Sequence, residues 1–304
     1  MFGHILLSII ITTAISSSSA SSMLTLQIAS RYLIPDIKKG LFHPAEDAIL
    51  SALVKDGSDI SVYWGVYESG KTVATWNAGL KLQQRDRLCI VLSGLDLTFH
   101  APQRDFNSIL RRRIGVPDDH ESLSKYITRP TSIIIDDFDI LSKKIDETIG
   151  PIRELNTSTL LVVSSWERAL ELRDNYGCKL IEPAGIGRWT VDQLVSLFLT
   201  LPQSIQDMCL GKEREELLRL STLAGAAGFL TFSIHEKQQH AGTHQSMTKR
   251  AEILATEWRN GINALTTTTT TTSSGGGEVV VIVGASSCGA VGRFPDKNGI
   301  FHWD

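Results

Sequence analysis

Hydrophobic positions between residues 32 and 201 alternate between two kinds of spacing. Short, almost continuously apolar runs are typical of strands buried on both faces of a parallel sheet. These runs occupy residues 59–64, 87–93, 131–136, 159–164 and 179–181. Between and after them, apolar residues recur at helical spacing. The helical segments are 45–55, 72–84, 106–113, 145–155, 166–175 and 191–199. This alternation predicts an α/β fold, a parallel sheet flanked by helices.

Strand-like runs end after residue 202, where the pattern becomes purely helical. The helical segments there are 204–209, 213–222, 226–235 and 248–263. The last of them places Ala251, Leu254, Ala255, Trp258 and Ile262 on one face. We therefore predict an α/β core over 26–202 and a small C-terminal helical lid subdomain over 203–264.

The two ends of the chain differ in composition from this core. A run of threonine at 266–272, followed by serine and glycine, predicts a flexible linker over 265–277. The tail at 278–304 is too short for an independent core. Residues 1–25 form a leader whose apolar and serine-rich parts resemble a secretory signal, but the usual positive residues before the apolar run are missing. The alternatives are a cleaved signal and a frayed leader.

The apolar run of the leader is too short and too interrupted to cross a membrane. We expect no transmembrane span and a cytoplasmic protein, or a secreted one if the leader is cleaved. Hydrophobic residues make up 42% and charged residues 21% of the chain, which excludes disordered, collagen-like and polytopic membrane classes. The net charge of −3 gives no strong nucleic-acid signal. Four dispersed cysteines without a CxxC pair argue against a disulfide framework or a structural zinc site.

A phosphate-binding motif joins the first strand to the next helix. The segment GVYESGKT at 65–72 matches G-x-x-x-x-G-K-S/T at every fixed position. Such a loop turns its backbone N–H groups toward nucleotide phosphates at the positive end of a helix. The expected binding residues are Gly65, Val66, Tyr67, Glu68, Ser69, Gly70, Lys71, Thr72 and Val73. Lys71 is expected to reach the β- and γ-phosphates and Thr72 to ligate Mg²⁺. The alternative is a structural glycine turn.

Glu68 is an unusual residue for an anion-binding loop, because its carboxylate repels phosphate unless it points outward. The alpha subunits of heterotrimeric G proteins have a similar Glu-Ser-Gly-Lys order, so that resemblance makes the residue tolerable. The chain has no guanine-reading NKxD segment. The Glu-Ser-Gly-Lys order therefore does not by itself make the chain a GTPase.

A second acidic strand follows 64 residues after Lys71. The segment IIIDDFD at 133–139 places Asp136 and Asp137 at the carboxyl end of a strand, the edge where ligands bind in open α/β folds. Asp136 is expected to hold Mg²⁺ and Asp137 to act as the general base toward the attacking water. The alternative is a helix cap or a solvated turn.

Together these segments resemble P-loop ATPases of the AAA+/STAND group, close in pattern to the NB-ARC-type switch ATPases. The resemblance covers about residues 32–232 and rests on 65–72, 133–139, 159–168 and the step from 179–183 to 191–198, with a looser likeness at 223–230. It implies a sensor strand ending near Ser164 and Ser165, where the family usually has Thr or Asn, with Arg168 one helical turn later. The lid lacks the family's proline.

The resemblance also implies how such a protein acts. Hydrolysis of ATP would drive a conformational switch between core and lid, with Lys71, Asp137, Ser165 and Arg168 as the catalytic set. The ligands would be ATP and ADP with Mg²⁺, and a homo-oligomer is expected if an arginine acts in trans. Candidate fingers are Arg129, Arg173 and Arg188. The alternatives are a nucleotide-binding scaffold without hydrolysis and a signalling or effector module that retains the fold. The sequence identifies no protein partner.

Overall fold

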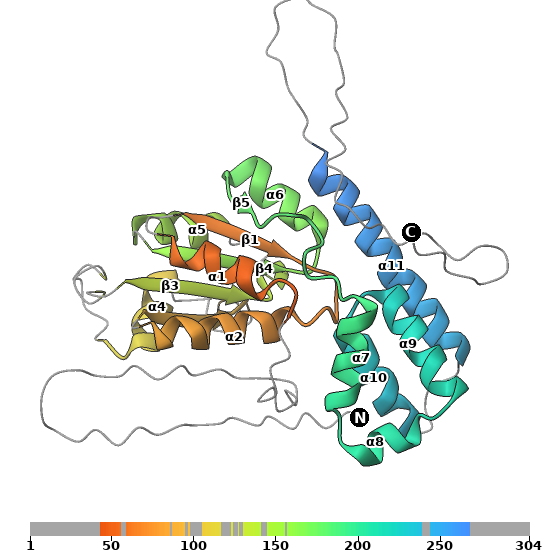
Figure 1. Cartoon of the computed structure of the whole chain (residues 1–304). Helices are drawn as coiled ribbons and strands as arrows, with labels where there is room; N and C mark the ends of the chain where they lie inside the picture. The colour runs from red at the N-terminus through yellow and green to blue at the C-terminus, as the bar shows by residue number, and fades with distance from the viewer. Residues whose placement is uncertain are drawn as a thin grey trace, which may run out of the picture.

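A parallel five-stranded sheet forms the centre of the described chain in the computed structural model (Figure 1). The structure describes residues 43–55, 59–85, 87–94, 97, 105–116, 123, 127, 130–140, 145–155, 157–238 and 244–267. The strands are β1 (Ile60–Trp64), β2 (Leu88–Ser93), β3 (Thr131–Asp136), β4 (Ser158–Val163) and β5 (Lys179–Leu180). Their order is β2-β3-β4-β1-β5.

The register of the strands places their carboxyl ends at one edge. Trp64, the last residue of β1, lies opposite Val163, the last residue of β4. Ser93 at the end of β2 lies opposite Asp136 at the end of β3. Because all pairs are parallel, the segments that follow β1, β3 and β4 emerge side by side.

Helices cover both faces of this sheet, because side chains alternate between the faces along each strand. Ile134 and Leu160 pack with α1 (Glu46–Val54) and α2 (Lys71–Gln84). Ile133 and Leu161 belong to the cluster on the other face. That cluster includes α4 (Phe106–Ile114), α5 (Ile145–Glu154) and α6 (Trp166–Tyr176). The expected α/β architecture is confirmed.

The helices that follow the sheet, called the lid from here on, are α7 (Val191–Thr200), α8 (Gln203–Met208), α9 (Lys212–Ala224), α10 (Ala227–Gln238) and α11 (His244–Thr266) (Figure 1). Leu194 and Phe198 of α7 share a hydrophobic cluster with Leu217 of α9 and Leu230 of α10. Helix α7, which the sequence pattern places at the end of the core, therefore packs with the lid helices.

Helix α11 joins the lid to the sheet. The rings of Trp258 and Trp64 meet edge to face, with centroids 5.1 Å apart. A Cβ at Gly261 would lie 2.2 Å from the Trp64 ring, so only glycine allows this approach. Trp258 also donates to the carbonyl of Ala224, at 3.0 Å. Lid and core consequently share one hydrophobic cluster.

Several expectations fall outside the described residues. They are the leader at 1–25, residues 268–277 of the expected linker, the tail at 278–304 and the finger candidate Arg129. Within the described part, no helix combines the length and hydropathy needed to cross a bilayer. Cys89, Cys178 and Cys209 are buried free thiols.

Candidate phosphate-binding site

The loop from Gly65 to Gly70 turns tightly between β1 and α2. The Gly65 N–H donates to Val163 of β4, and the Ser69 N–H closes a turn on the Val66 carbonyl, at 3.2 Å. A Cβ on Gly65 would lie 2.8 Å from the Ser69 hydroxyl oxygen. Gly70 precedes the first residue of α2 with φ +93°, a conformation that favours glycine. Both glycines of the motif thus have a steric reason, and the loop leads into the positive end of α2.

Two aromatic side chains form hydrogen bonds to the backbone of this loop. The Ser69 carbonyl accepts hydrogen bonds from His43 Nε2, at 2.9 Å, and from Trp189 Nε1, at 2.8 Å. His43 Nδ1 accepts the Ala45 N–H, at 3.1 Å, so the ring carries its proton on Nε2. Burial lowers the pKa of His43 to about 4, which keeps the imidazole neutral. Sequence reasoning did not select either residue.

Lys71 lies folded across the loop. Its ammonium donates to the Val66 carbonyl, at 2.8 Å, and the side chain is buried. Burial lowers the pKa of Lys71, while the carboxylates of Asp136, Asp139 and Asp137 act in the opposite direction. The ammonium is therefore placed in the loop, close to several acidic groups.

Thr72 and Asp136 meet directly although they are 64 residues apart. The Thr72 hydroxyl donates to Asp136 Oδ2, at 2.7 Å, and Asp136 Oδ1 accepts the Asp137 N–H, at 3.1 Å. Burial raises the pKa of Asp136, and the hydrogen bond from Thr72 opposes that rise. The contact joins the phosphate loop to the end of β3.

The Thr72 hydroxyl and the Asp136 carboxylate are oxygen donors of the kind that hard divalent cations prefer. The described residues contain no group of three or more His, Cys, Asp or Glu side chains that could hold an ion. Mg²⁺ usually keeps several waters and binds through one or two protein oxygens plus substrate phosphates. Thr72 and Asp136 supply that donor set, so the residues fit Mg²⁺ held together with a phosphate.

Asp137 follows β3 with a strained backbone. Its φ is +54°, and the residue is exposed at the sheet edge. The backbone passes very close to Gly94, where a Cβ would lie 2.2 Å from the Asp137 carbonyl oxygen. Gly94, which sequence reasoning did not select, therefore permits the position of Asp137.

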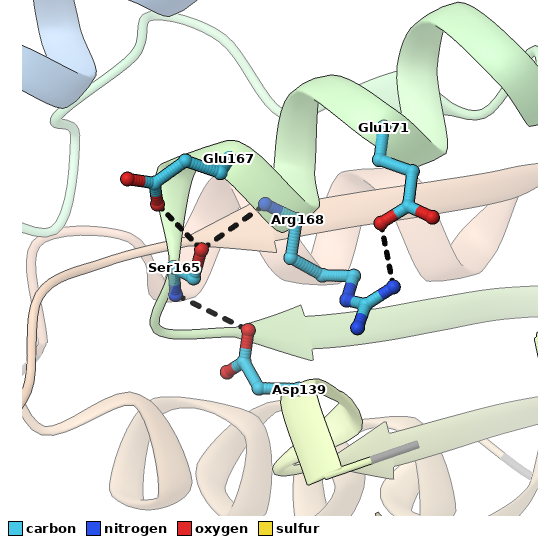
Figure 2. A network of polar contacts seen from close by, with 5 residues as sticks. All are labelled: Asp139, Ser165, Glu167, Arg168 and Glu171. Carbon is cyan, nitrogen blue, oxygen red and sulfur yellow. Dashed lines mark hydrogen bonds and ion pairs between the residues drawn. The ribbon is translucent and has the colours of Figure 1, made fainter. Parts of the chain in front are cut away.

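Asp139 connects this turn to the end of β4 (Figure 2). It lies in the short 3₁₀ helix η2 (Phe138–Ile140) and accepts the N–H groups of Ser164 and Ser165. Burial raises the pKa of Asp139, and these two hydrogen bonds oppose the rise. The sequence feature that could have marked Asp139 as a site residue is its position in the acidic run, two residues after Asp137.

Ser165 and Arg168 lie beside this junction with partners of their own (Figure 2). The Ser165 hydroxyl caps α6 by accepting the Arg168 N–H, at 3.1 Å, and donates to Glu167, at 2.6 Å. The Arg168 guanidinium pairs with Glu171, at 2.5 Å. Their role toward a phosphate stays a prediction.

The remaining finger candidates have different surroundings. Arg173 pairs with Asp174, at 2.6 Å, and donates to the Leu265 carbonyl of α11, at 3.2 Å. Arg188 lies against Gly225, where a Cβ would come within 2.5 Å of its side chain. Arg173 thus links α6 to α11 within the chain.

Comparisons with known proteins give only distant likenesses. No protein-family model and no curated protein matches the chain. Among solved structures it is similar to the replication initiator DnaA bound to AMPPCP and single-stranded DNA, with a TM-score of 0.41 and 14% identity over 67% of this chain and 63% of that one. It is also similar to Cdc6p from Pyrobaculum aerophilum, with a TM-score of 0.37 and 14% identity over 74% and 65%.

A third likeness is to domain III of Thermotoga maritima DnaA, with a TM-score of 0.40 and 15% identity over 70% of this chain and 90% of that one. The chain spans less than two thirds of the first two proteins. At these scores and identities the likenesses assign neither a ligand nor a partner to this chain. The description of its site rests on its own residues.

Proposed function

We propose that the chain is an ATP-binding P-loop protein of the AAA+/STAND type that hydrolyses ATP to drive a switch between core and lid. The contact between Thr72 and Asp136, at 2.7 Å, carries this proposal. It joins the hydroxyl of the phosphate motif to the first carboxylate of the acidic strand, beside the buried ammonium of Lys71. A structural glycine turn gives no reason for this convergence.

Each residue then has a role that its position supports. The loop N–H groups and Lys71 bind the phosphates, while Thr72 and Asp136 hold Mg²⁺. Mg²⁺ would neutralise charge on the phosphate oxygens. Exposed Asp137 accepts the proton of the water that attacks the γ-phosphorus. The bond between the γ-phosphorus and the oxygen that bridges it to the β-phosphorus then breaks, and ADP leaves. Self-association through a trans-acting arginine, for which Arg188 is a candidate, belongs to the same proposal.

The second candidate is a scaffold that binds ATP without hydrolysis. The hydrogen bonds of Ser165 and the ion pair of Arg168 within α6 favour it, because both side chains of the expected sensor already have partners. Binding without phosphate release would distinguish the scaffold from the ATPase.

Phosphate release from ATP with Mg²⁺ tests the hydrolytic role of Asp137. We expect Asp137→Asn to bind ATP but to release phosphate about 100-fold more slowly, because a general base contributes about that much. Asp207→Asn, an equal charge change on α8, serves as the matched control and should retain the wild-type rate. ATP binding with no phosphate release by the wild type would replace the ATPase by the scaffold.

A further inference from the structure

An ion pair connects the phosphate loop to the last lid helix. Arg250 of α11 pairs with the Glu68 carboxylate, 182 residues away in sequence. The guanidinium also lies 4.0 Å above the Phe232 ring and 3.5 Å from Glu236, both on α10. Because the Glu68 and Arg250 side chains are only 14% and 24% exposed, water screens this pair less than a surface ion pair.

A backbone contact reinforces this link at the same loop residue. The Gly228 N–H, in the first turn of α10, donates to the Glu68 carbonyl, at 2.7 Å. A Cβ on Gly228 would lie 2.7 Å from that oxygen and 2.9 Å from Glu68 Cβ. Glycine is therefore required for the lid to approach the loop so closely. Glu68 itself has φ +66°, which turns this residue toward the lid.

The charge of Glu68 matters for anything that binds in the loop. Burial lowers the pKa of Lys71, and Glu68 is one of the carboxylates whose field acts against that lowering. That field extends to the ammonium expected to contact phosphate. In the described part of the chain, Glu68 Oε2 is buried without a hydrogen-bond partner. The cation that forms an ion pair with this carboxylate is Arg250.

We propose that Arg250 is a positioning residue that neutralises Glu68, so that phosphate binding in the loop requires the docked lid. When the lid moves away, the uncompensated carboxylate repels phosphate. When the lid docks, Arg250 pairs with that carboxylate and the Gly228 N–H holds the Glu68 backbone in place. By linkage, bound phosphate must then favour the docked lid to the same degree. This inference rests on the proposed nucleotide site.

A double-mutant cycle on the full chain separates this role from direct ligand contact. The affinity for a fluorescent ATP analogue with Mg²⁺ is measured for the wild type, Arg250→Gln, Glu68→Gln and the double variant. We expect Arg250→Gln to weaken binding by about tenfold, because the unit charge of Glu68 is then left without its ion-pair partner. In the Glu68→Gln background the same substitution should change affinity by less than about twofold, since no charge remains to be compensated.

Two further variants act as controls for this cycle. Lys249→Gln removes the same charge from the neighbouring, exposed position of α11 and should leave the affinity unchanged. Arg250→Lys keeps the charge and should recover most of the affinity that Arg250→Gln loses. Recovery by lysine distinguishes a charge effect from the loss of the guanidinium packing on Phe232.

Three results would overturn the proposal. Equal losses from Arg250→Gln in the wild-type and Glu68→Gln backgrounds would mean that Arg250 contacts the ligand or only supports folding. Wild-type affinity in Arg250→Gln would mean that Glu68 needs no compensation. A wild type without nucleotide binding would overturn the proposed function together with this inference, whereas the first two results leave the proposed function standing.

Discussion

At the scale of single residues, backbone strain in the described chain is concentrated at the candidate site. Glu68 and Asp137 are the described non-glycine residues with positive φ, at +66° and +54°. One lies in the phosphate loop and the other directly after β3. Such conformations cost roughly 1–3 kcal/mol each and are typical of functional positions. In this conformation Glu68 contacts Arg250 and Gly228 of the lid.

The motif residues were predictable because they lie together in two short segments of the sequence, 65–72 and 133–139. His43 and Trp189 were not, because they reach the Ser69 carbonyl from 26 and 120 residues away. The spacing of neighbouring residues does not predict hydrogen bonds between such distant parts of the chain. Arg250 was missed for the same reason.

The stability of the protein should fall in acid because His43 is buried in its neutral form. Burial lowers the pKa of His43 to about 4 in the folded state, whereas a histidine in an unfolded chain titrates near 6.5. The unfolded state therefore binds more protons between these values. As the pH falls from about 6.5 to 4, this residue removes up to roughly 3 kcal/mol of unfolding free energy.

Chemical denaturation of the wild type and His43→Gln across this range measures the effect. The variant should lose less stability than the wild type between pH 6.5 and 4. His235→Gln, at an exposed position, should behave as the wild type does. Parallel pH profiles for the wild type and His43→Gln would show that His43 is not buried as a neutral ring.

At the scale of elements, the strands and most helices could be predicted from the apolar pattern. Short continuous apolar runs such as 131–136 are typical of strands that are buried on both faces of a sheet. The order β2-β3-β4-β1-β5 did not follow, because strand pairing depends on contacts between distant segments. The membership of α7 in the lid was equally hidden. Leu194 and Phe198 show where the helix has an apolar face but not which partner covers it.

The packing of β2 against the turn after β3 should depend on Gly94. A Cβ there would lie 2.2 Å from the Asp137 carbonyl oxygen, so Gly94→Ala must displace one of the two backbones. We expect a loss of about 1–3 kcal/mol of unfolding free energy and slower phosphate release, because Asp137 moves.

Gly150→Ala is the matched control for this substitution. Among the described residues, and apart from the two chain neighbours and the nearby backbone of α5, no heavy atom lies within 4 Å of a Cβ built there. In helix α5 the new Cβ meets only the ring of the following Pro151, so this change should alter the unfolding free energy by less than about 1 kcal/mol. Unchanged stability in Gly94→Ala would contradict the close approach of the two strand ends.

At the scale of the whole molecule, core and lid form one packed body in which the candidate site lies at their junction. Trp64 and Trp258 join the two parts through their rings, and Glu68 joins them through Arg250 and Gly228. The loop at 65–70 is thus in direct contact with the lid helices, so a movement of the loop acts on the lid. This geometry suits a protein in which ligand occupancy alters the position of the lid.

Equilibrium binding of ATP with Mg²⁺ to the full chain, for the wild type and Lys71→Ala, tests the central claim most directly. The account predicts saturable binding by the wild type and a loss on the order of 100-fold in Lys71→Ala, because charge-assisted hydrogen bonds to phosphate are lost. Lys212→Ala, on the lid helix α9, should bind as the wild type does. No binding by the wild type, or equal binding by Lys71→Ala, would contradict the assignment of a nucleotide site to this loop.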